Sequence, residues 1–455
     1  MELLIIGGSD AGISAALRAK EVNPEVRPTI VLADQYPNFS ICGLPFYLSG
    51  EVSDWQSLAH RDIAAIESHG IFVRKKSRCI AVDPPQRTVC LDIGAKKNAV
   101  MAYDKLVLCT GARSTAPKIS GLNLPGVFFL RWMDDCFAME KYINDNQPQS
   151  IIIVGAGYIG MELADAMTKR GLAVTVLEYA SSVLTTLDDD MGKHVLKELE
   201  DHGVKVMTGV SVKKIEGREN RLMVQAGRMG LEDLEIKADM VLVATGSRPE
   251  TQLCRPAGIE TGVAGAIRVN SRMETNLPDI YAAGDCAETR HRLLDRNTWL
   301  PLGTTAHKQG SVAGENAAGG SSVFAGSLGT QCVKIFSLVA ARTGLNDTEA
   351  EKEGFSPLRV DTEAPDHKAY YPGAKQLHIR ITGDRITGTL LGAQILGPHG
   401  AEISKRIDIF STALYHSMKV RNICHLDLSY TPPLSSPWDP VQMAAMAWER
   451  VRERI

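Results

Sequence analysis

Apolar runs broken by glycine turns and followed by helical stretches are the dominant pattern of this chain. Residues 3–6 form an unbroken apolar run that ends at Gly7 and passes into an alanine-rich stretch reaching Lys20. The same succession returns at residues 150–179, where a second apolar run follows the helical stretch. A continuous apolar run is typical of a parallel strand covered on both faces, and its alternation with helices predicts an α/β fold.

Two further apolar segments end in a threonine-glycine turn. Residues 103–117 place Thr110 and Gly111 after a buried strand, and residues 238–250 place Gly246 in the same way. We expect each of these segments to close one nucleotide-binding unit, because such units end in a strand beside the first one.

A third strand, in residues 278–288, leads through a tight glycine turn to Asp285. A carboxylate at the end of a buried strand is suited to bind the hydroxyl groups of a cofactor's sugar-alcohol chain. Asp285 is therefore a candidate ligand-binding residue.

The pattern changes after about residue 330. Apolar strands at 377–382 and 386–397 precede an amphipathic helical stretch at 401–417, which predicts an α+β module and not a third nucleotide fold. The chain continues in a proline-rich aromatic tail at 426–450. A purely structural role for this tail, covering a sheet or wrapping a neighbour, is as well favoured as a role in a site.

A chain of 455 residues is too long for a single hydrophobic core. We expect an α/β protein with two Rossmann-like dinucleotide-binding domains, one inserted in the other, and a C-terminal α+β domain. The first would contain residues 1–115 and 245–325, the second 116–244 and the third 326–455.

The second glycine turn has the full dinucleotide-binding pattern, with Gly155, Gly157 and Gly160 between a strand and a helix and Glu178 closing the next strand. Gly155 would make the tight turn, Gly157 would admit the pyrophosphate and Gly160 would let helix and strand pack closely. Glu178 can bind a ribose 2′-hydroxyl and would repel a 2′-phosphate, which favours NADH over NADPH.

The first glycine turn is less regular. Ser9 takes the place of the middle glycine, between Gly8 and Gly12, and Asp34 takes the place of the terminal glutamate. Both changes keep the chemistry, since serine is small and aspartate still accepts a hydrogen bond from ribose.

Composition narrows the function classes. A net charge of −3 at pH 7 gives no electrostatic case for binding nucleic acid or an anionic membrane, and the apolar run at the N-terminus is too short for a signal peptide or a spanning helix. The nine cysteines contain no CxxC pair, so the pattern favours a reducing cytoplasm over a disulfide framework. No histidine spacing suggests a metal site, and we expect none.

One cysteine stands apart. Cys42 lies about one βαβ unit after the first glycine turn, which returns it to the nucleotide end of the predicted sheet. Because no second cysteine follows within a few residues, an oxidised Cys42 needs a cap from outside, either a small thiol or an oxygen atom. Gly43 and Pro45 suit the start of a helix, whose N-terminus would favour the thiolate.

Taken together, the motifs resemble the single-cysteine branch of the flavin-dependent pyridine nucleotide-disulfide oxidoreductases, over nearly the whole chain. This branch includes coenzyme A disulfide reductases, persulfide reductases, and NADH oxidases and peroxidases. The strings that carry the resemblance are GGSDAG, SICGLPFYLSG, CTGA, GAGYIGMELA, VATGSRPE, YAAGDCAE, LPLGTTAHKQG, GTQCVKIF, ARTGL, HKAYYPGA, LGAQILG, KRIDIF and LSYTPPLSSPWDP.

The resemblance implies FAD in the first domain, NADH or NADPH in the second, and a C-terminal domain that pairs two subunits. Cys42 would abut the flavin, Tyr158 would shield it, and Glu162 would lie near the nicotinamide. The residues expected to bind the dinucleotides are Gly7, Gly8, Ser9, Ala11, Gly12, Asp34, Thr110, Gly111, Asp285, Gly155, Gly157, Tyr158, Ile159, Gly160, Glu162, Glu178 and Gly246.

The resemblance also implies substrate contacts. Tyr430 and one of Tyr370 and Tyr371 match tyrosines that coenzyme A disulfide reductases present from the partner subunit to the reacting sulfur. Arg18 and Lys20 match part of a basic cluster for coenzyme A phosphates, although a solvated helix face is as well favoured.

The pattern departs from the family at several positions, one of which is Leu434, where the family often has a second aromatic residue after the two prolines. His307 replaces a frequent asparagine in the substrate channel, Glu21 sits where another arginine is common, and Asp10 holds the place of a histidine used by oxidases and peroxidases. The lost histidine counts against efficient oxygen or peroxide reduction.

We therefore expect a homodimeric FAD enzyme that uses NADH to reduce a small disulfide or persulfide through Cys42, with coenzyme A derivatives among the candidate substrates. The first alternative is an NADH oxidase or peroxidase that cycles Cys42 through sulfenic acid. The second is an electron-transfer reductase for a protein such as ferredoxin or rubredoxin, in which Cys42 would be dispensable.

Overall fold

A computed structural model describes residues 1–95, 97–219, 221–228 and 233–454. These residues form two compact units. The first contains residues 1–115, 131–137 and 246–327, and the second contains residues 116–130, 138–245 and 328–455. Within the described residues, no helix combines the length and apolar character that crossing a bilayer requires.

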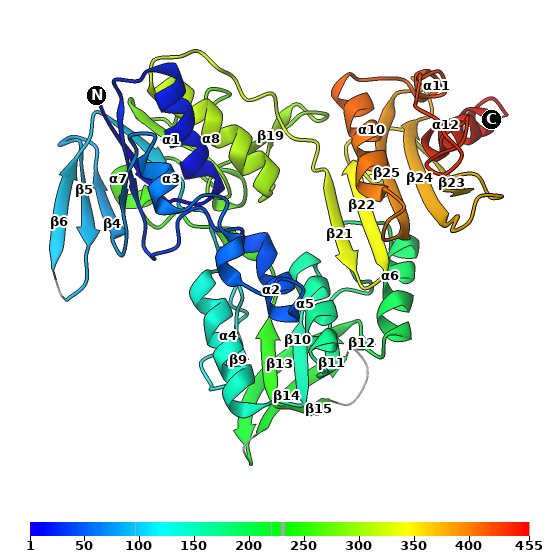
Figure 1. The fold of residues 1–455 in the computed structure, drawn as a ribbon, viewed down its shortest axis with the longest axis horizontal. Coiled ribbons are helices and arrows are strands. Elements are labelled where there is room, and N and C mark those ends of the chain that lie inside the picture. Colours follow the sequence, from blue (N-terminus) through cyan, green and yellow to red (C-terminus); the bar gives the residue numbers. More distant parts are fainter. Residues whose placement is uncertain (96, 220, 229–232, 455) are drawn as a thin grey trace. The chain divides into compact units, whose positions relative to one another are not determined.

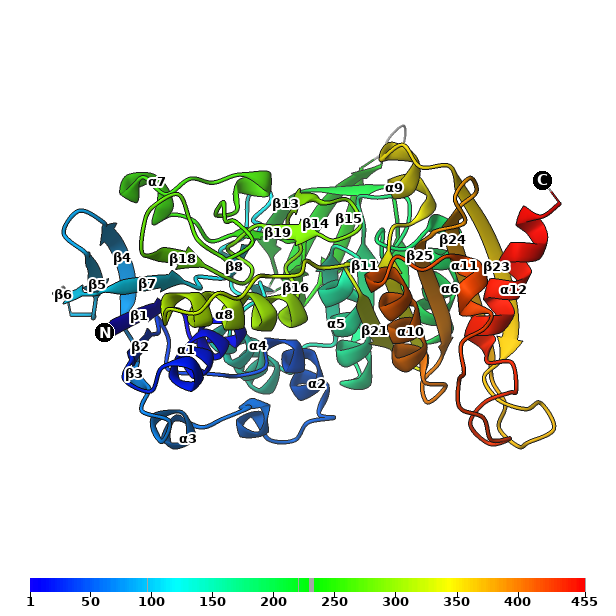
Figure 2. The ribbon, with the colours of Figure 1, turned by 90° about the horizontal axis from the view of Figure 1, so that it is seen from above.

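A five-stranded parallel sheet in the order β18-β7-β1-β2-β3 forms the centre of the first unit (Figure 2). Its central strand is the apolar run at the N-terminus, whose Ile5 lies opposite Ile30 and Val107 and is fully buried. The five strands are β1 (Glu2–Ile6), β2 (Arg27–Val31), β3 (Phe72–Arg74), β7 (Lys105–Leu108) and β18 (Ile280–Ala282).

Helices α1 (Asp10–Val22) and α8 (Gly303–Ala317) pack side by side on this sheet (Figures 1 and 2). Glycines on α8 allow the close approach, because a Cβ at Gly310 would lie 2.2 Å from the carbonyl oxygen of Ala11. Residues far apart in the sequence are therefore brought together at the start of both helices.

Smaller elements complete the first unit. They are the 3₁₀ turns η1 (Ile41–Gly43), η2 (Trp55–Leu58) and η3 (Val263–Gly265), the helices α2 (Leu44–Ser49), α3 (Ile63–Glu67) and α7 (Cys254–Ala257), the antiparallel sheet of β4 (Arg78–Asp83), β5 (Thr88–Asp92) and β6 (Asn98–Ala102), and the pairs β8 (Ala112–Ser114) with β17 (Ser247–Pro249) and β19 (Thr289–His291) with β20 (Arg296–Thr298).

The second unit begins with a matching nucleotide fold, a parallel sheet in the order β12-β11-β10-β16-β9. Its strands are β9 (Val127–Phe128), β10 (Ser150–Val154), β11 (Ala173–Leu177), β12 (Lys205–Met207) and β16 (Met240–Val243). Its helices are α5 (Tyr158–Lys169), α6 (Asp189–Asp201) and the part of α4 (Met133–Asn146) that follows residue 137. An antiparallel sheet of β13 (Val210–Arg218), β14 (Arg221–Arg228) and β15 (Leu234–Ala238) lies against this fold.

The rest of the second unit is the expected α+β module. An antiparallel sheet in the order β21-β22-β25-β24-β23 carries four helices. The strands are β21 (Gln331–Ile335), β22 (Leu338–Gly344), β23 (Pro357–Pro365), β24 (Gln376–Asp384) and β25 (Leu390–Pro398), and the helices are α9 (Asp347–Lys352), α10 (Ile403–Tyr415), α11 (Val420–Ile423) and α12 (Pro440–Arg452).

The proline-rich tail divides into two parts. Its second part is α12, where the Asp439 side chain caps the helix and Pro440 occupies its first turn. Trp448 on α12 is fully buried and donates a hydrogen bond of 2.7 Å to the carbonyl oxygen of Leu358. This half of the tail covers the sheet, as one of the two interpretations predicts, whereas the half around Tyr430 remains exposed.

Candidate active site

Cys42 is an exposed thiol in the 3₁₀ turn η1, in the first unit. Helix α2 begins two residues later, at Leu44, with Gly43 at the N-cap position. The segment is tied to the first glycine turn because Asn38 donates its amide to the carbonyl oxygen of Gly8, at 2.8 Å. Cys42 therefore lies at the nucleotide end of the sheet, but before the helix and not in its first turn.

Seven of the other eight cysteines are partly or fully buried, unlike Cys42. No disulfide joins any of the nine, all of which lie in the described residues. Burial raises the pKa of Cys79 and of Cys254 to about 12 and raises that of Cys109, so these thiols stay protonated. Cys332 is the second exposed cysteine, and loss of hydration raises its pKa.

The first glycine turn closes tightly under α1. A Cβ at Gly12 would lie 1.9 Å from the carbonyl oxygen of Gly7, and one at Gly7 would lie 2.0 Å from that of Cys109. Ser9 precedes the helix without capping it through its side chain, so the amides of the first turn face the nucleotide end of the sheet. Ala11 is buried against α8.

The other predicted residues of the first unit have defined partners. Asp34 accepts a hydrogen bond from the amide of Tyr36 at 2.9 Å, and burial raises the pKa of its carboxyl. Thr110 donates to the carbonyl oxygen of Glu250 at 2.6 Å. The carbonyl oxygens of its neighbour Gly111 and of Gly246 accept backbone amides where β8 and β17 pair.

Asp285 is engaged by a cation that the sequence did not reveal. Arg131 donates a hydrogen bond of 2.6 Å to the Asp285 carboxylate. The guanidinium also donates to the carbonyl oxygen of Ala112, at 3.2 Å. Arg131 therefore fixes the carboxylate expected to bind the cofactor chain.

The two cations expected to bind coenzyme A phosphates are already neutralised or bonded. Arg18 forms ion pairs with Glu315 at 2.7 Å and with Glu21 at 3.0 Å. Lys20 donates to the carbonyl oxygens of Pro24 and Val26, at 2.5 and 3.2 Å. An anionic ligand would have to replace these partners, which favours the interpretation of a solvated helix face.

His307 joins a cluster that sequence reasoning did not find. Its Nδ1 lies 2.9 Å from the Ser14 hydroxyl, and its Nε2 lies 3.5 Å from a carboxylate oxygen of Asp10. Asp10 and Ser14 stand one turn apart on α1, and His307 comes from α8. The spacing of Asp10 and Ser14 was visible in the sequence, but the partner helix was not.

The second glycine turn has the backbone geometry that the dinucleotide-binding pattern predicts. Gly155 has a φ of +108°, and a Cβ at Gly160 would lie 2.1 Å from the Gly155 carbonyl oxygen. Nothing lies within 4 Å of the Cβ position at Gly157. Glu178 holds this loop, since its carboxylate accepts hydrogen bonds from the amides of Ala156 at 2.5 Å and Ala180 at 2.7 Å.

Tyr158 and Glu162 follow on α5, with Ile159 between them partly exposed. Burial raises the pKa of the Tyr158 phenol, which receives a hydrogen bond of 3.4 Å from Thr186. Burial also raises the pKa of the Glu162 carboxyl to about 7, against the opposing attraction of Lys334. Glu162 thus titrates in the range in which a group can exchange protons near neutral pH.

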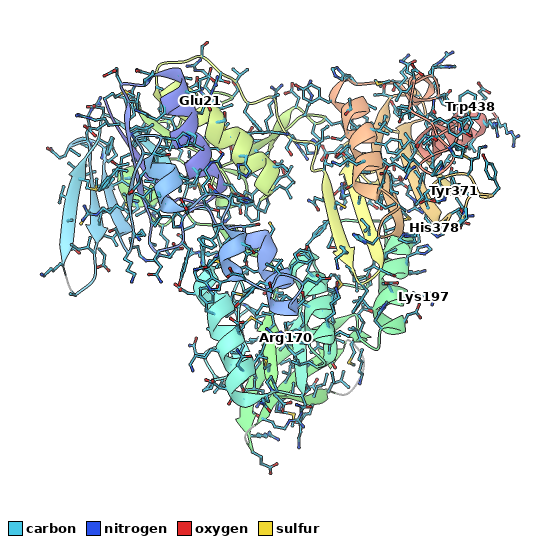
Figure 3. The ribbon with its side chains drawn as sticks, in the orientation of Figure 1. Glu21, Arg170, Lys197, Tyr371, His378 and Trp438 are labelled. Atoms are coloured by element: carbon cyan, nitrogen blue, oxygen red, sulfur yellow. The ribbon has the colours of Figure 1, made fainter. Side chains whose placement is uncertain are left out.

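The three tyrosines lie in exposed parts of the C-terminal module. A loss of hydration and a hydrogen bond with Tyr370 raise the pKa of the Tyr430 phenol. Tyr371 instead packs edge-on against His367, with ring centres 5.8 Å apart. Figure 3 shows Tyr371 and Trp438 at the outer edge of this module, where both are about half exposed. Tyr370 is therefore the partner of Tyr430.

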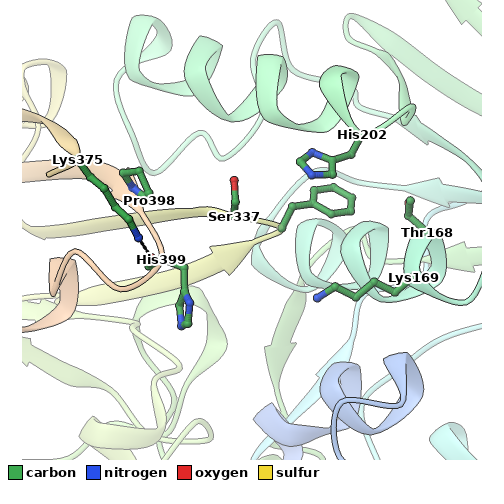
Figure 4. A pocket seen from close by; sticks show the side chains of 8 residues that line it. Thr168, Lys169, His202, Ser337, Lys375, Pro398 and His399 are labelled. Carbon is green, nitrogen blue, oxygen red and sulfur yellow. Dashed lines mark hydrogen bonds between the residues drawn. The ribbon is translucent and has the colours of Figure 1, made fainter. Parts of the chain in front are cut away.

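A hollow of about 750 Å³ lies elsewhere in the second unit (Figure 4). His202 stacks on Phe336 there, with ring centres 4.0 Å apart. Its lysines are bonded, Lys169 to Asp165 at 3.0 Å and Lys375 to the carbonyl oxygen of His399 at 2.8 Å. The hollow contains none of the predicted site residues.

Both glycine turns fit a dinucleotide. In each, the strand ends in a glycine with a φ above +100° and an uncapped helix follows, so backbone amides point at the place of a pyrophosphate. In the described part of the chain, no group of three or more His, Cys, Asp or Glu side chains could hold a metal ion.

Comparison with known proteins gives the same assignment. The family model of the pyridine nucleotide-disulphide oxidoreductases matches residues 1–310, and that of their dimerisation domain matches residues 330–440. A Pyrococcus abyssi protein named NAD(P)H sulfur oxidoreductase (CoA-dependent) is 34% identical over 446 residues, 97% of each chain. A Methanocaldococcus jannaschii protein named NADH oxidase is 34% identical over 448 residues, 98% of each chain.

Among solved structures, the NAD-dependent persulfide reductase from A. fulgidus matches with a TM-score of 0.94 and 33% identity, over 100% of this chain and 84% of that one. The expected fold class is confirmed, and so are the expected enzyme class and the expected use of FAD with NADH or NADPH. Two glycine turns, an exposed cysteine beside the first of them and matches along almost the whole length lead to one conclusion: the chain belongs to the pyridine nucleotide-disulphide oxidoreductase family.

Proposed function

We propose that this protein reduces a small disulfide or persulfide with NADH, through Cys42. The observation that carries the proposal is the exposure and position of this sulfur. Cys42 is exposed, its segment is hydrogen-bonded to the first glycine turn through Asn38, and no second cysteine lies in its own turn. An external thiol can reach such a sulfur, whereas the buried thiols of Cys109 and Cys254 stay protonated and covered.

The chemistry balances as NADH + H⁺ + RSSR → NAD⁺ + 2 RSH. The Cys42 thiolate attacks one sulfur of the disulfide, the S–S bond breaks, and RS⁻ leaves as Cys42 becomes a mixed disulfide. When bound, FAD supplies the redox step, taking a hydride from NADH and passing two electrons to sulfur. Those two electrons break the mixed disulfide and release the second thiolate.

The surroundings of α1 favour a substrate with little negative charge. Coenzyme A carries a 3′-phosphate and a diphosphate, which need cations, but Arg18 is held by Glu315 and Glu21. The P. abyssi relative is named for its dependence on coenzyme A, so a coenzyme A persulfide belongs in the same test. A Glu315→Gln variant would remove one of the two carboxylates that pair with Arg18 and is expected to lower the KM for a coenzyme A substrate.

The decisive experiment combines the mass of the intact protein with measurements of NADH consumption by wild type and variants. Intact protein, as purified, is expected to carry a reducible adduct on Cys42 whose mass identifies the thiol. Cys42→Ser should abolish NADH consumption with every disulfide and persulfide, while Cys332→Ser, the other exposed cysteine, should behave as wild type. Full turnover by Cys42→Ser would refute the mechanism and favour an electron-transfer reductase.

The named NADH oxidase among the relatives makes oxidase or peroxidase activity the second candidate. It predicts stoichiometric NADH loss with oxygen or peroxide alone and a single added oxygen atom on Cys42. An adduct of thiol mass, with slow oxygen consumption, would exclude it.

We also propose that the protein acts as a homodimer in the reducing cytoplasm. The match to a dimerisation domain at residues 330–440 supports pairing of two copies, and scattered single cysteines support the compartment.

A further inference from the structure

We propose that Asp10, His307 and Ser14 form a proton relay that protonates the first thiolate, the one released when Cys42 attacks the substrate disulfide. This inference rests on the function proposed above. It adds two residues that move the proton, Asp10 and His307, and one positioning residue, Ser14.

The geometry makes a continuous chain from the surface to the first glycine turn. The Ser14 hydroxyl lies 2.9 Å from Nδ1 of His307, and Nε2 of the same ring lies 3.5 Å from the Asp10 carboxylate. The imidazole side chain is 51% exposed and that of Asp10 is 25% exposed, so the ring can exchange protons with water while the carboxyl is shielded.

Close packing of α1 and α8 holds the chain in place. Asp10 is the first residue of α1, and Ser14 stands one turn further on the same face. His307 lies in the second turn of α8, whose start covers the second Asp10 oxygen, since a Cβ at Gly303 would lie 3.3 Å from it. Because Gly310 lets the two helices touch, the separation of His307 from its partners is fixed.

Burial and three titratable groups determine the pKa of Asp10. Burial raises the pKa of its carboxyl, His307 and His60 lower it, and Asp285 raises it. The charge of Asp285 is itself compensated by Arg131, at 2.6 Å. The outcome is a carboxyl whose pKa lies above the ordinary range, so it retains its proton to higher pH than an exposed aspartate.

His60, whose charge lowers the pKa of Asp10, belongs to the segment that follows Cys42. The amide of His60 donates to the carbonyl oxygen of Asn38 at 2.9 Å, and Asn38 donates in turn to Gly8, two residues before Asp10. The segment that carries Cys42 is therefore bonded to the turn from which Asp10 rises.

The reaction needs one proton from the medium. A hydride carries two electrons and one proton equivalent, which serve the thiolate released on reduction of the mixed disulfide. The thiolate displaced earlier, when Cys42 attacks the disulfide, must take its proton from the medium. A carboxylic acid is a stronger acid than a thiol, and transfer from Asp10 to the thiolate is favourable. His307 then returns a proton to Asp10, and Ser14, bonded to Nδ1, keeps Nε2 directed at the carboxyl.

The test uses the complete flavoenzyme. Asp10→Asn and His307→Asn are expected to lower kcat for disulfide reduction by about 100-fold, the usual scale of a lost acid catalyst, and to flatten its pH profile. The rate at which NADH reduces the enzyme should not change, because that step needs no proton from the relay. Ser14→Ala should shift the pH profile with a smaller loss, and Lys308→Ala, on the next exposed position of α8, should act as wild type.

A second measurement is independent of turnover. The infrared C=O stretch of the Asp10 carboxylic acid, isolated as the difference between wild type and Asp10→Asn, should persist to higher pH than that of an exposed aspartate and should shift in His307→Asn. If wild type reduces disulfides but both variants keep its kcat and pH profile, the relay is wrong and the function stands. If wild type reduces no disulfide, the proposed function is wrong. An unshifted carboxyl band in His307→Asn would show that Asp10 and His307 do not interact, whatever the result of the turnover experiment.

Discussion

Glu162 should make the stability of the second unit depend on pH. Its carboxyl has a pKa raised to about 7 by burial, so the unfolded chain loses this proton at lower pH than the folded chain. The free energy of unfolding therefore falls as pH rises above the ordinary glutamate pKa. Above about pH 7 this loss of stability is complete. A shift of this size corresponds to about 3 kcal/mol.

The variant Glu162→Gln removes the titration. We expect it to unfold at higher temperature than wild type at pH 8 and at about the same temperature at pH 5, measured by thermal unfolding. Glu235→Gln, a carboxyl that is about half exposed, is the matched control and should change neither value. Equal effects of Glu162→Gln at both pH values would contradict the raised pKa.

Glu178 should set the choice between NADH and NADPH. Its carboxylate carries its charge at the end of β11 and is held by the amides of Ala156 and Ala180. Glu178→Gln keeps the size and removes the charge, so a 2′-phosphate is no longer repelled. We expect the ratio of kcat/KM for NADPH to that for NADH to rise about tenfold, or about 1.4 kcal/mol. An unchanged ratio in steady-state kinetics would show that the specificity lies elsewhere.

Single residues were predictable where the signal is local. The spacing of Gly155, Gly157 and Gly160 and the position of Glu178 follow from the needs of one turn, and the sequence is sufficient for them. The partner of a side chain on another element is different. Ser14 and His307 are 293 positions apart, and nothing in either segment encodes their contact.

Between elements, the stability of the second unit should depend on one buried arginine. Arg380 on β24 is 2% exposed and binds three carboxylates, those of Asp188, Asp190 and Asp361, at 2.6 to 3.0 Å. Hydrogen bonds from its guanidinium, together with its charge, lower the pKa of Asp190 to about 2. Asp188 and Asp190 belong to the start of α6 and Asp361 to β23, so the guanidinium joins the nucleotide fold to the C-terminal sheet.

Replacing Arg380 by Met should destabilise the second unit by about 3–5 kcal/mol, because the buried Asp188 carboxylate loses its counter-ion. Arg359→Met is the control, since that side chain is 47% exposed and makes longer ion pairs. Chemical denaturation at pH 7 measures both. The pair of Arg380 and Asp190 stabilises the fold fully above the ordinary aspartate pKa, and this stabilisation disappears as pH falls toward 2. The difference in unfolding free energy between wild type and Arg380→Met should therefore become smaller in acid.

Helices and strands were predictable where the sequence has a periodic apolar pattern or a clear signal for the start of a helix. The parallel strands, the helices after both glycine turns and α10 follow from apolar runs and amphipathic spacing. Helix α12 has a clear start signal in Asp439, Pro440 and Gln442, but the aromatic and proline content of the tail obscured it. The start of α2 after Cys42 could not be placed exactly, because Gly43 and Pro45 both suit a first turn.

At the scale of the whole molecule, the tyrosines decide whether an active site belongs to one chain or to two. Tyr370 and Tyr430 are hydrogen-bonded to each other and exposed in the second unit, and the resemblance places such a pair at the sulfur of the partner subunit. A subunit with Cys42→Ser would then lack its sulfur but still provide tyrosines. A subunit with Tyr370→Phe and Tyr430→Phe would have the sulfur but lack the phenols.

Co-expression of these two inactive subunits tests the arrangement. Random pairing makes half of the dimers mixed, and each mixed dimer contains one site with both an intact Cys42 and intact tyrosines, so about a quarter of wild-type activity should return. Recovery would depend on pairing and be lost on dilution below the dissociation constant of the dimer. If the tyrosines served the sulfur of their own subunit, no mixed dimer would contain a complete site, and the mixture would stay as inactive as its parts.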